Sequence, residues 1–117
     1  MAALVLQGLG KAAPAAVPEL IEALKDSVSP TRFMAAIALG RMGDAARSAV
    51  PALIERLRAP DEEFRVRRNI IRALGSIGPP AVSAIPALRE ARKQEGLEQE
   101  VGGAIMRIHG QSPPTWH

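Results

Sequence analysis

The chain contains no cysteine, no tyrosine and only three aromatic residues, and these absences exclude several kinds of site. Without cysteine there is no disulfide, no thiolate metal site and no cysteine nucleophile. Phe33, Phe64 and Trp116 are too few for a base-stacking surface or for a typical β-sandwich core. The sequence has no apolar run long enough to span a bilayer, and Met1 to Leu9 lacks the basic start of a signal peptide. We therefore expect a cytoplasmic protein.

A large excess of charge is also missing. The 15 basic residues, 12 of which are arginine, stand against 12 acidic residues and give a net charge of +3. This balance permits an acidic partner without requiring one. The scarcity of lysine and of aromatic residues between the arginines disfavours nucleic acid. What the chain does contain is apolar: 47% of its residues, much of it alanine, leucine, isoleucine and valine, a composition that suits closely packed helices.

A unit of about 33 residues recurs along the chain. Three glycines and three prolines keep the same spacings of 33 and then 35 residues: Gly10, Gly43, Gly78, Pro18, Pro51 and Pro86. A chain that repeats itself at this period is interpreted first as a repeat protein. We expect one domain over residues 1–110, made of a half repeat at 1–10 and repeats at 11–43, 44–78 and 79–110, followed by a tail at 111–117.

Each full unit predicts two helices. The first carries apolar residues at helical spacing and has its proline a turn or two inside, which predicts a kinked or late-starting helix. The second ends at the repeat glycine, which can adopt the left-handed conformation of a helix C-cap. The seven helices predicted in this way span 2–9, 14–25, 30–42, 45–58, 62–77, 80–93 and 97–109.

The repeat resembles the HEAT family. The pattern Ala-Leu-Gly-x-x-Gly-x-x-Ala-x-x-Ala-Val-Pro-x-Leu-Ile-x-x-Leu runs from Ala38 to Leu57 and is similar to the short bacterial type found in phycobilin-lyase-like HEAT proteins. The signatures of ankyrin and tetratricopeptide repeats, which have similar periods, are absent. The resemblance covers residues 1 to about 109. It implies an all-α fold: a right-handed α–α superhelix, or HEAT-like solenoid, of seven helices in about three and a half repeats.

In that family, an aspartate and an arginine six residues later form a ladder that ties one repeat to the next. The residues that match this pattern are Asp26 with Arg32, and Asp61 with Arg67. In the last repeat, Arg92 and Glu98 occupy the two positions with their charges exchanged. The resemblance therefore implies a structural ladder through the first two pairs and a break at the third.

The resemblance also implies that the second helices line a concave face, whose outward positions are candidate binding residues. These positions are Leu4, Phe33, Ile37, Arg41, Arg65, Arg68, Arg72 and Arg107. The apolar N-terminal half predicts a contact with a partner, with a further repeat or with a second copy of the chain, since nothing caps the first helix. The arginines predict either a site for carboxylate or phosphate groups or a solvated face balanced by nearby acids.

No group of residues indicates catalysis or metal binding. His109 and His117 lack carboxylates at ligand spacing, and no serine, histidine and aspartate form a triad pattern. We predict a non-enzymatic protein-interaction or scaffold module without a cofactor, which binds a protein or peptide and is open to self-association through its uncapped N-terminal end. The alternatives are anion or nucleic-acid binding through the concave arginines, and bilin lyase-related activity, which the resemblance implies for some relatives.

Overall fold

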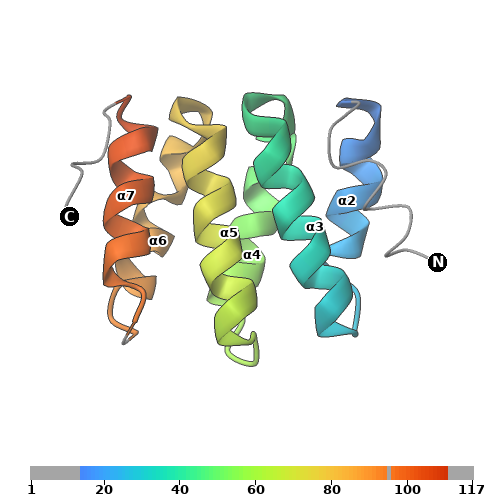
Figure 1. The fold of residues 1–117 in the computed structure, drawn as a ribbon, viewed down its shortest axis with the longest axis horizontal. Coiled ribbons are helices and arrows are strands. Elements are labelled where there is room, and N and C mark those ends of the chain that lie inside the picture. The colour runs from blue at the N-terminus through green and yellow to red at the C-terminus, as the bar shows by residue number, and fades with distance from the viewer. Residues whose placement is uncertain (1–13, 95, 111–117) are drawn as a thin grey trace.

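The computed structural model describes residues 14–94 and 96–110, and this part of the chain is helical without a strand (Figure 1). Its α-helices are α2 (Val17–Ala23), α3 (Ser29–Met42), α4 (Val50–Arg58), α5 (Phe64–Ile77), α6 (Ile85–Ala91) and α7 (Glu98–Ile108). Three 3-10 helices accompany them: η1 (Pro14–Ala16), η2 (Gly43–Ala49) and η3 (Pro79–Ala84). The all-α prediction is confirmed. The described part contains six α-helices rather than seven, and the helix predicted at 2–9 lies outside it.

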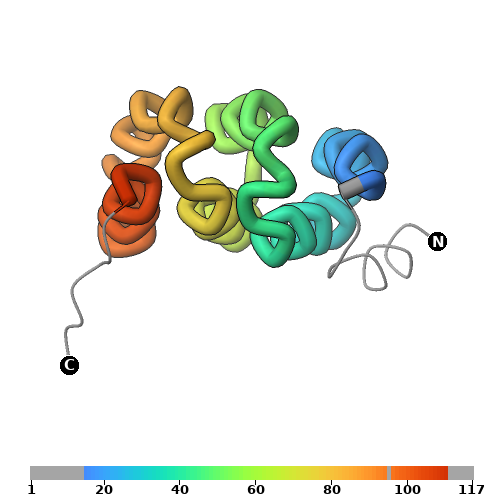
Figure 2. Tube along the Cα trace, turned by 90° about the horizontal axis from the view of Figure 1, so that it is seen from above, coloured from blue at the N-terminus to red at the C-terminus, as the bar shows by residue number. Residues whose placement is uncertain are grey.

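The helices form two layers. Figure 2 shows α2, α4 and α6 in one layer and α3, α5 and α7 in the other, with successive repeats side by side. The first layer has helices of 7, 9 and 7 residues, and the second has helices of 14, 14 and 11 residues. We call these the short helices and the long helices, and the exposed side of the second layer the long-helix face. The core between the layers is built from fully buried aliphatic residues, among them Leu20, Leu39, Leu53, Leu74 and Leu88.

Proline explains why the short α-helices start late. Pro18, Pro51 and Pro86 are each the second residue of a short helix, where a missing backbone N–H costs no hydrogen bond. The preceding residues form the 3-10 helices, and Ala46 and Ala81 interrupt two of these with non-helical backbone angles. The predicted kinked or late-starting first helix is therefore confirmed in each described repeat.

Glycine ends the first two long helices. Gly43 has φ +61° and ψ −137°, and Gly78 has φ +81° and ψ −146°. The positive φ was expected, but the ψ values lie far from the left-handed helical region and in backbone space that is open essentially to glycine alone. Gly10, the third member of this set, lies outside the described residues.

Neighbouring long helices approach each other through small residues. A Cβ atom added to Gly40 would lie 3.4 Å from the Cα of Ala73, and one added to Gly75 would lie 3.0 Å from the Cα of Ala104. Both glycines stand two residues before the last residue of their helix, and Met106 holds that position in α7. The close stacking of α3 on α5 and of α5 on α7 therefore depends on positions without a side chain.

Candidate functional site

A two-pronged ion pair on the long-helix face joins α5 to α7. Nε of Arg72 donates to Oε2 of Glu100 at 3.1 Å, and Nη2 of Arg72 donates to Oε1 at 3.0 Å. These hydrogen bonds raise the pKa of Arg72, against the opposite effect of burial. The Arg72 side chain is 51% exposed and the Glu100 side chain 28%. Arg72, a predicted binding residue, thus already holds a carboxylate of its own chain.

Two hollows meet at Arg72. The smaller, of about 200 Å³, lies between α3 and α5 and is lined by residues that include Ile37, Gly40, Arg41, Asn69, Arg72 and Ser76. The larger, of about 600 Å³, extends over α7 and includes Arg72, Glu100, Gly103 and Arg107 in its wall. The long-helix face is therefore hollowed along its width, with an apolar floor at Ile37 and Gly40 and arginines at the margins.

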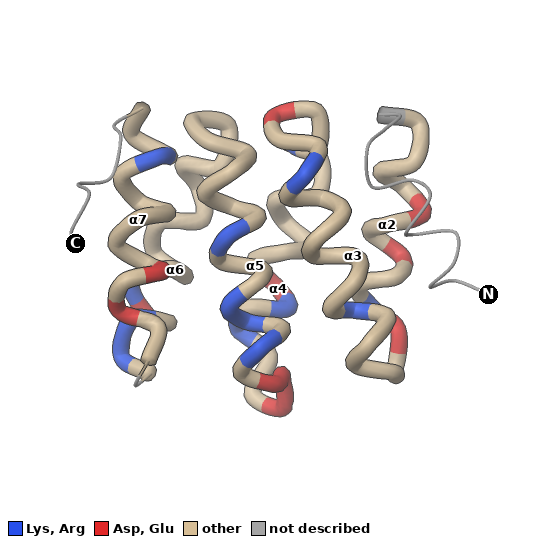
Figure 3. Tube along the Cα trace, viewed as in Figure 1, with Lys and Arg blue, Asp and Glu red and all other residues tan. Residues whose placement is uncertain are grey.

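Arg41 and Arg107 occupy the same position on α3 and α7, one residue before the end of each helix. Both side chains are exposed, and neither makes an ion pair with any residue in 14–94 or 96–110. Ser76 holds the same position on α5. Figure 3 shows basic positions on all three long helices. Arg41 and Arg107 therefore add positive charge to that face, and no acidic residue in the described part of the chain pairs with it.

The predicted apolar half of the face is more covered than we expected. Phe33 is half-buried, packs against the core, and has the guanidinium carbon of Arg65 at 4.7 Å from its ring centroid. Nε of Arg65 also lies 3.8 Å from a carboxylate oxygen of Glu63. Arg68 is half-buried, and its Nε has no hydrogen-bond partner among the described residues. Leu4, the remaining predicted member of the apolar half, lies outside the described residues.

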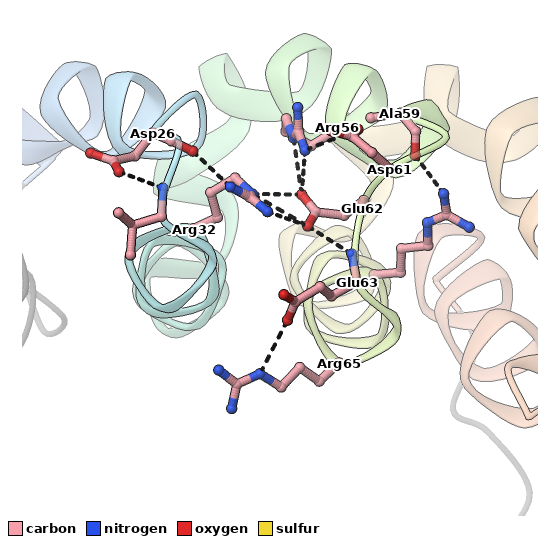
Figure 4. Close-up of polar contacts among 10 residues, drawn as sticks. Asp26, Arg32, Arg56, Ala59, Asp61, Glu62, Glu63 and Arg65 are labelled. Carbon is pink, nitrogen blue, oxygen red and sulfur yellow. Dashed lines mark hydrogen bonds and ion pairs between the residues drawn. The ribbon is translucent and has the colours of Figure 1, made fainter.

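A buried carboxylate connects two repeats behind this face. Glu62, in the connection between α4 and α5, accepts hydrogen bonds from Arg32 of α3 at 2.9, 3.0 and 3.3 Å (Figure 4). It also accepts two from Arg56 of α4, at 3.0 and 2.8 Å, and one from the backbone N–H of Glu63 at 2.9 Å. The side chain of Glu62 is 0% exposed and that of Arg32 is 9% exposed. Burial by itself raises the pKa of Glu62, but these hydrogen bonds outweigh it and hold the pKa below its usual range.

The predicted ladder was wrong about which carboxylates take part. The carboxylates of Asp26 and Asp61 do not pair with Arg32 and Arg67. Arg32 donates to the backbone carbonyl of Asp26 at 2.8 Å, while the carboxylate of Asp26 accepts the backbone N–H of Val28 at 2.8 Å. Asp61 has an 85% exposed side chain, 4.0 Å from Arg56.

Both predicted ladder arginines do link consecutive repeats. Arg67 donates to the backbone carbonyl of Ala59 and, at 3.0 Å, to the side-chain oxygen of Gln94 in the next repeat. Arg32 reaches forward to Glu62 in the same way. Glu98, one of the two exchanged residues, accepts the backbone N–H of Gly96 at 3.0 Å.

The described residues contain no group of three or more histidine, cysteine, aspartate or glutamate side chains placed to hold a metal ion. His109 is exposed and forms the C-cap of α7, where its backbone N–H bonds to carbonyls of Ile105 and Arg107. Within the same ranges, no helix has the length and apolar character needed to cross a membrane.

Two residues that organise the site were missed by sequence reasoning, Glu62 and Glu100. Glu100 stands one turn before Gly103, which occupies the position equivalent to Arg72 in the next helix. Because glycine offers no side chain there, the carboxylate one turn earlier is within reach of Arg72. Comparing neighbouring helices diagonally would have suggested this pair.

Comparison with known proteins gives one match. A protein-family model described as HEAT repeats matches residues 1–65 and, again, residues 43–101. No curated protein matches the chain, and no solved structure does.

Proposed function

Because the chain belongs to the HEAT-repeat family, we propose that it is a non-enzymatic protein-interaction or scaffold module whose contact surface is the long-helix face. HEAT repeats typically mediate protein interactions or scaffolding. In this proposal the family match along residues 1–101 supports the role, and the hollowed long-helix face supports the choice of surface, with Arg41 and Arg107 unpaired within the described ranges. The long-helix face is then the concave side of a right-handed superhelix.

The physical basis is that the repeats have similar buried residues, which stack one repeat on the next, and differ from one another at exposed positions of the long-helix face. Core positions repeat as alanine, leucine and isoleucine, whereas Ile37, Arg72 and Gly103 occupy one equivalent position on the three long helices. This position is apolar on α3, basic on α5 and without a side chain on α7. A surface that varies in this way along a rigid scaffold offers a specific partner several distinct contacts.

The test is site-specific photo-crosslinking from the purified chain. A photoreactive amino acid replaces Arg41 on the long-helix face or, as the matched control, Arg89, which is exposed on α6 in the other layer. Proteins joined at position 41 are identified, purified and tested for direct binding, with amide exchange used to map protection. Protection of α3 and α5 by a purified partner supports the proposal. Identical cross-links from both positions, or protection confined to α4 and α6, would overturn it.

The finer resemblance to phycobilin-lyase-like proteins adds a separate hypothesis, that the chain acts on bilins. The arginines of the long-helix face offer forks that suit propionate groups. Titration with a bilin and absorption spectroscopy test this hypothesis. A spectral shift that is lost when Arg41 and Arg107 are replaced would favour it over the interaction role, and an unchanged spectrum at high concentration rules it out.

A further inference from the structure

The long-helix face combines unpaired arginines of the described residues with two hollows. We propose that the face takes an acidic, extended peptide segment with an aliphatic side chain, and that Glu100 occupies part of this site as a competing carboxylate of the chain itself. The inference rests on the proposed function and deepens it by naming the class of partner.

Three arginines are distributed across the long-helix face, one on each long helix. Arg41 and Arg107 stand at equivalent positions on α3 and α7, exposed and without ion-pair partners among the described residues. Arg72 lies on α5 between those two helices, where the two hollows meet. Each guanidinium presents a planar fork that matches a carboxylate. A segment that crosses the three long helices therefore meets an arginine on each.

The smaller hollow between these charges has a mostly apolar lining. Ile37 and Gly40 line the smaller hollow, whose volume of about 200 Å³ suits a side chain rather than a whole small molecule. Asn69 and Ser76 stand in the wall of the same hollow. The Asn69 amide nitrogen donates to the Arg65 carbonyl at 2.9 Å, which leaves the amide oxygen to accept from a peptide N–H. Alternating carboxylate and aliphatic side chains fit this arrangement.

The aromatic residues and the charge of Glu100 favour a peptide over a nucleic acid as the ligand. Phe33 is covered by Arg65, and Phe64 is 39% exposed at the start of α5, where it packs against Gly96. The described part of the face therefore has no aromatic platform for bases. Glu100 also stands beside Arg72, where it would repel a continuous phosphate backbone. A peptide can space its carboxylates around that negative charge.

The role of Glu100 follows from its contacts with Arg72. Its two oxygens accept from Nε and Nη2 of Arg72, which is the geometry that a ligand carboxylate would adopt. An acidic segment must displace Glu100 or approach Arg72 against its charge. Removing this charge while keeping the side-chain shape should strengthen binding, a result opposite to that of most changes within a binding site.

Fluorescence anisotropy with a labelled EELEELEE peptide tests the inference on the full chain. The comparison peptides are QQLQQLQQ, which lacks the charges, EEGEEGEE, which lacks the aliphatic side chains, and a single-stranded oligothymidine of similar charge. We expect EELEELEE to bind at least about tenfold more tightly than the three comparison probes, because it offers carboxylates to Arg41, Arg72 and Arg107 as well as leucine side chains to the smaller hollow. The binding should also weaken with salt.

The variants have matched controls. Arg41→Gln with Arg107→Gln should weaken EELEELEE binding about tenfold or more, and the control Arg47→Gln with Arg89→Gln, two exposed arginines on η2 and α6, should not. Glu100→Gln should tighten binding several-fold. Its control is Glu90→Gln, because Glu90 accepts from Nε and Nη2 of Arg58, both at 3.1 Å, in the same two-pronged manner on the short helices.

Three outcomes overturn the inference: no EELEELEE binding up to about 1 mM, equal binding of EELEELEE and oligothymidine, or equal effects of Glu100→Gln and Glu90→Gln. The proposed interaction role is tested separately from the acidic-peptide inference. A purified partner that cross-links at position 41 and protects α3 and α5, but does not compete with EELEELEE, would preserve the interaction role and reject the acidic-peptide class.

Discussion

Arg32 of one repeat and Glu62 of the next form a buried ion pair, with Nε 2.9 Å from Oε2 and the two side chains 9% and 0% exposed. The same carboxylate holds Arg56 at 2.8 Å, so one glutamate fastens the end of α4 to the start of α3. Charge buried at this depth is stabilising only while all partners remain in place.

The first prediction is that Glu62→Gln lowers the free energy of unfolding by about 3 kcal/mol, because it leaves two arginines without their carboxylate in a buried site. Urea unfolding followed by circular dichroism measures the change. Glu90→Gln is the control, since it removes the same group from an ion pair whose side chains are 47% and 58% exposed, and it should cost far less. Equal losses in the two variants would contradict the account.

The second prediction concerns pH. The pKa of Glu62 is lower in the folded chain than in the unfolded chain, so its contribution is fully present above the unfolded value and is lost as the pH falls through the folded value. We expect the free energy of unfolding to decline below about pH 4.3, the ordinary pKa of a glutamate. Urea titrations between neutral and acidic pH should show a shallower decline for Glu62→Gln. Parallel curves for the two proteins would be evidence against this linkage.

The third prediction compares three helical glycines whose surroundings differ. Gly75→Ala places a Cβ 3.0 Å from the backbone of α7, Gly40→Ala places one 3.4 Å from the backbone of α5, and Gly102→Ala meets nothing within 4 Å. Alanine gains up to about 1 kcal/mol in a helix, while overpacking costs about 1–3 kcal/mol. Thermal unfolding should therefore rank Gly102→Ala as most stable and Gly75→Ala as least. A Gly75→Ala variant as stable as Gly102→Ala would contradict the close approach of α7 and show that this helix moves to accommodate the added atom.

The fourth prediction isolates the backbone at the end of α5. A Cβ atom added to Gly78 or to Gly102 meets no other atom within 4 Å, but only Gly78 has a positive φ, of +81°. Gly78→Ala should lose about 1–3 kcal/mol of stability from backbone strain alone, and Gly102→Ala should lose none. Chemical denaturation of the two variants provides the measurement, and indistinguishable midpoints would refute the strain.

The sequence predicted the local architecture well because prolines and glycines act within a few residues. Pro51 fixed the late start of α4, and Gly78 fixed the end of α5. The predictions that failed needed distances between helices. Phe33 was expected to belong to an exposed apolar patch, yet it is half-buried and the guanidinium of Arg65 from the neighbouring long helix lies over its ring.

The predicted ladder also failed because the sequence does not show which side chains come within hydrogen-bonding distance. Asp26 was predicted to meet Arg32, but its short carboxylate bonds the backbone N–H of Val28 two residues on, as aspartate commonly does in turns. Glu62 is one methylene longer, lies directly after Asp61, and reaches two arginines. The six-residue spacing between an aspartate and an arginine does not indicate which nearby carboxylate pairs with the arginine.

Met106 distinguishes α7 from the two other long helices. Gly40 and Gly75 let the next long helix approach closely, whereas Met106 holds the equivalent position in α7. A methionine side chain extends well beyond the hydrogen of a glycine, so we expect that a further long helix stacked on α7 would lie farther from it than α5 lies from α3.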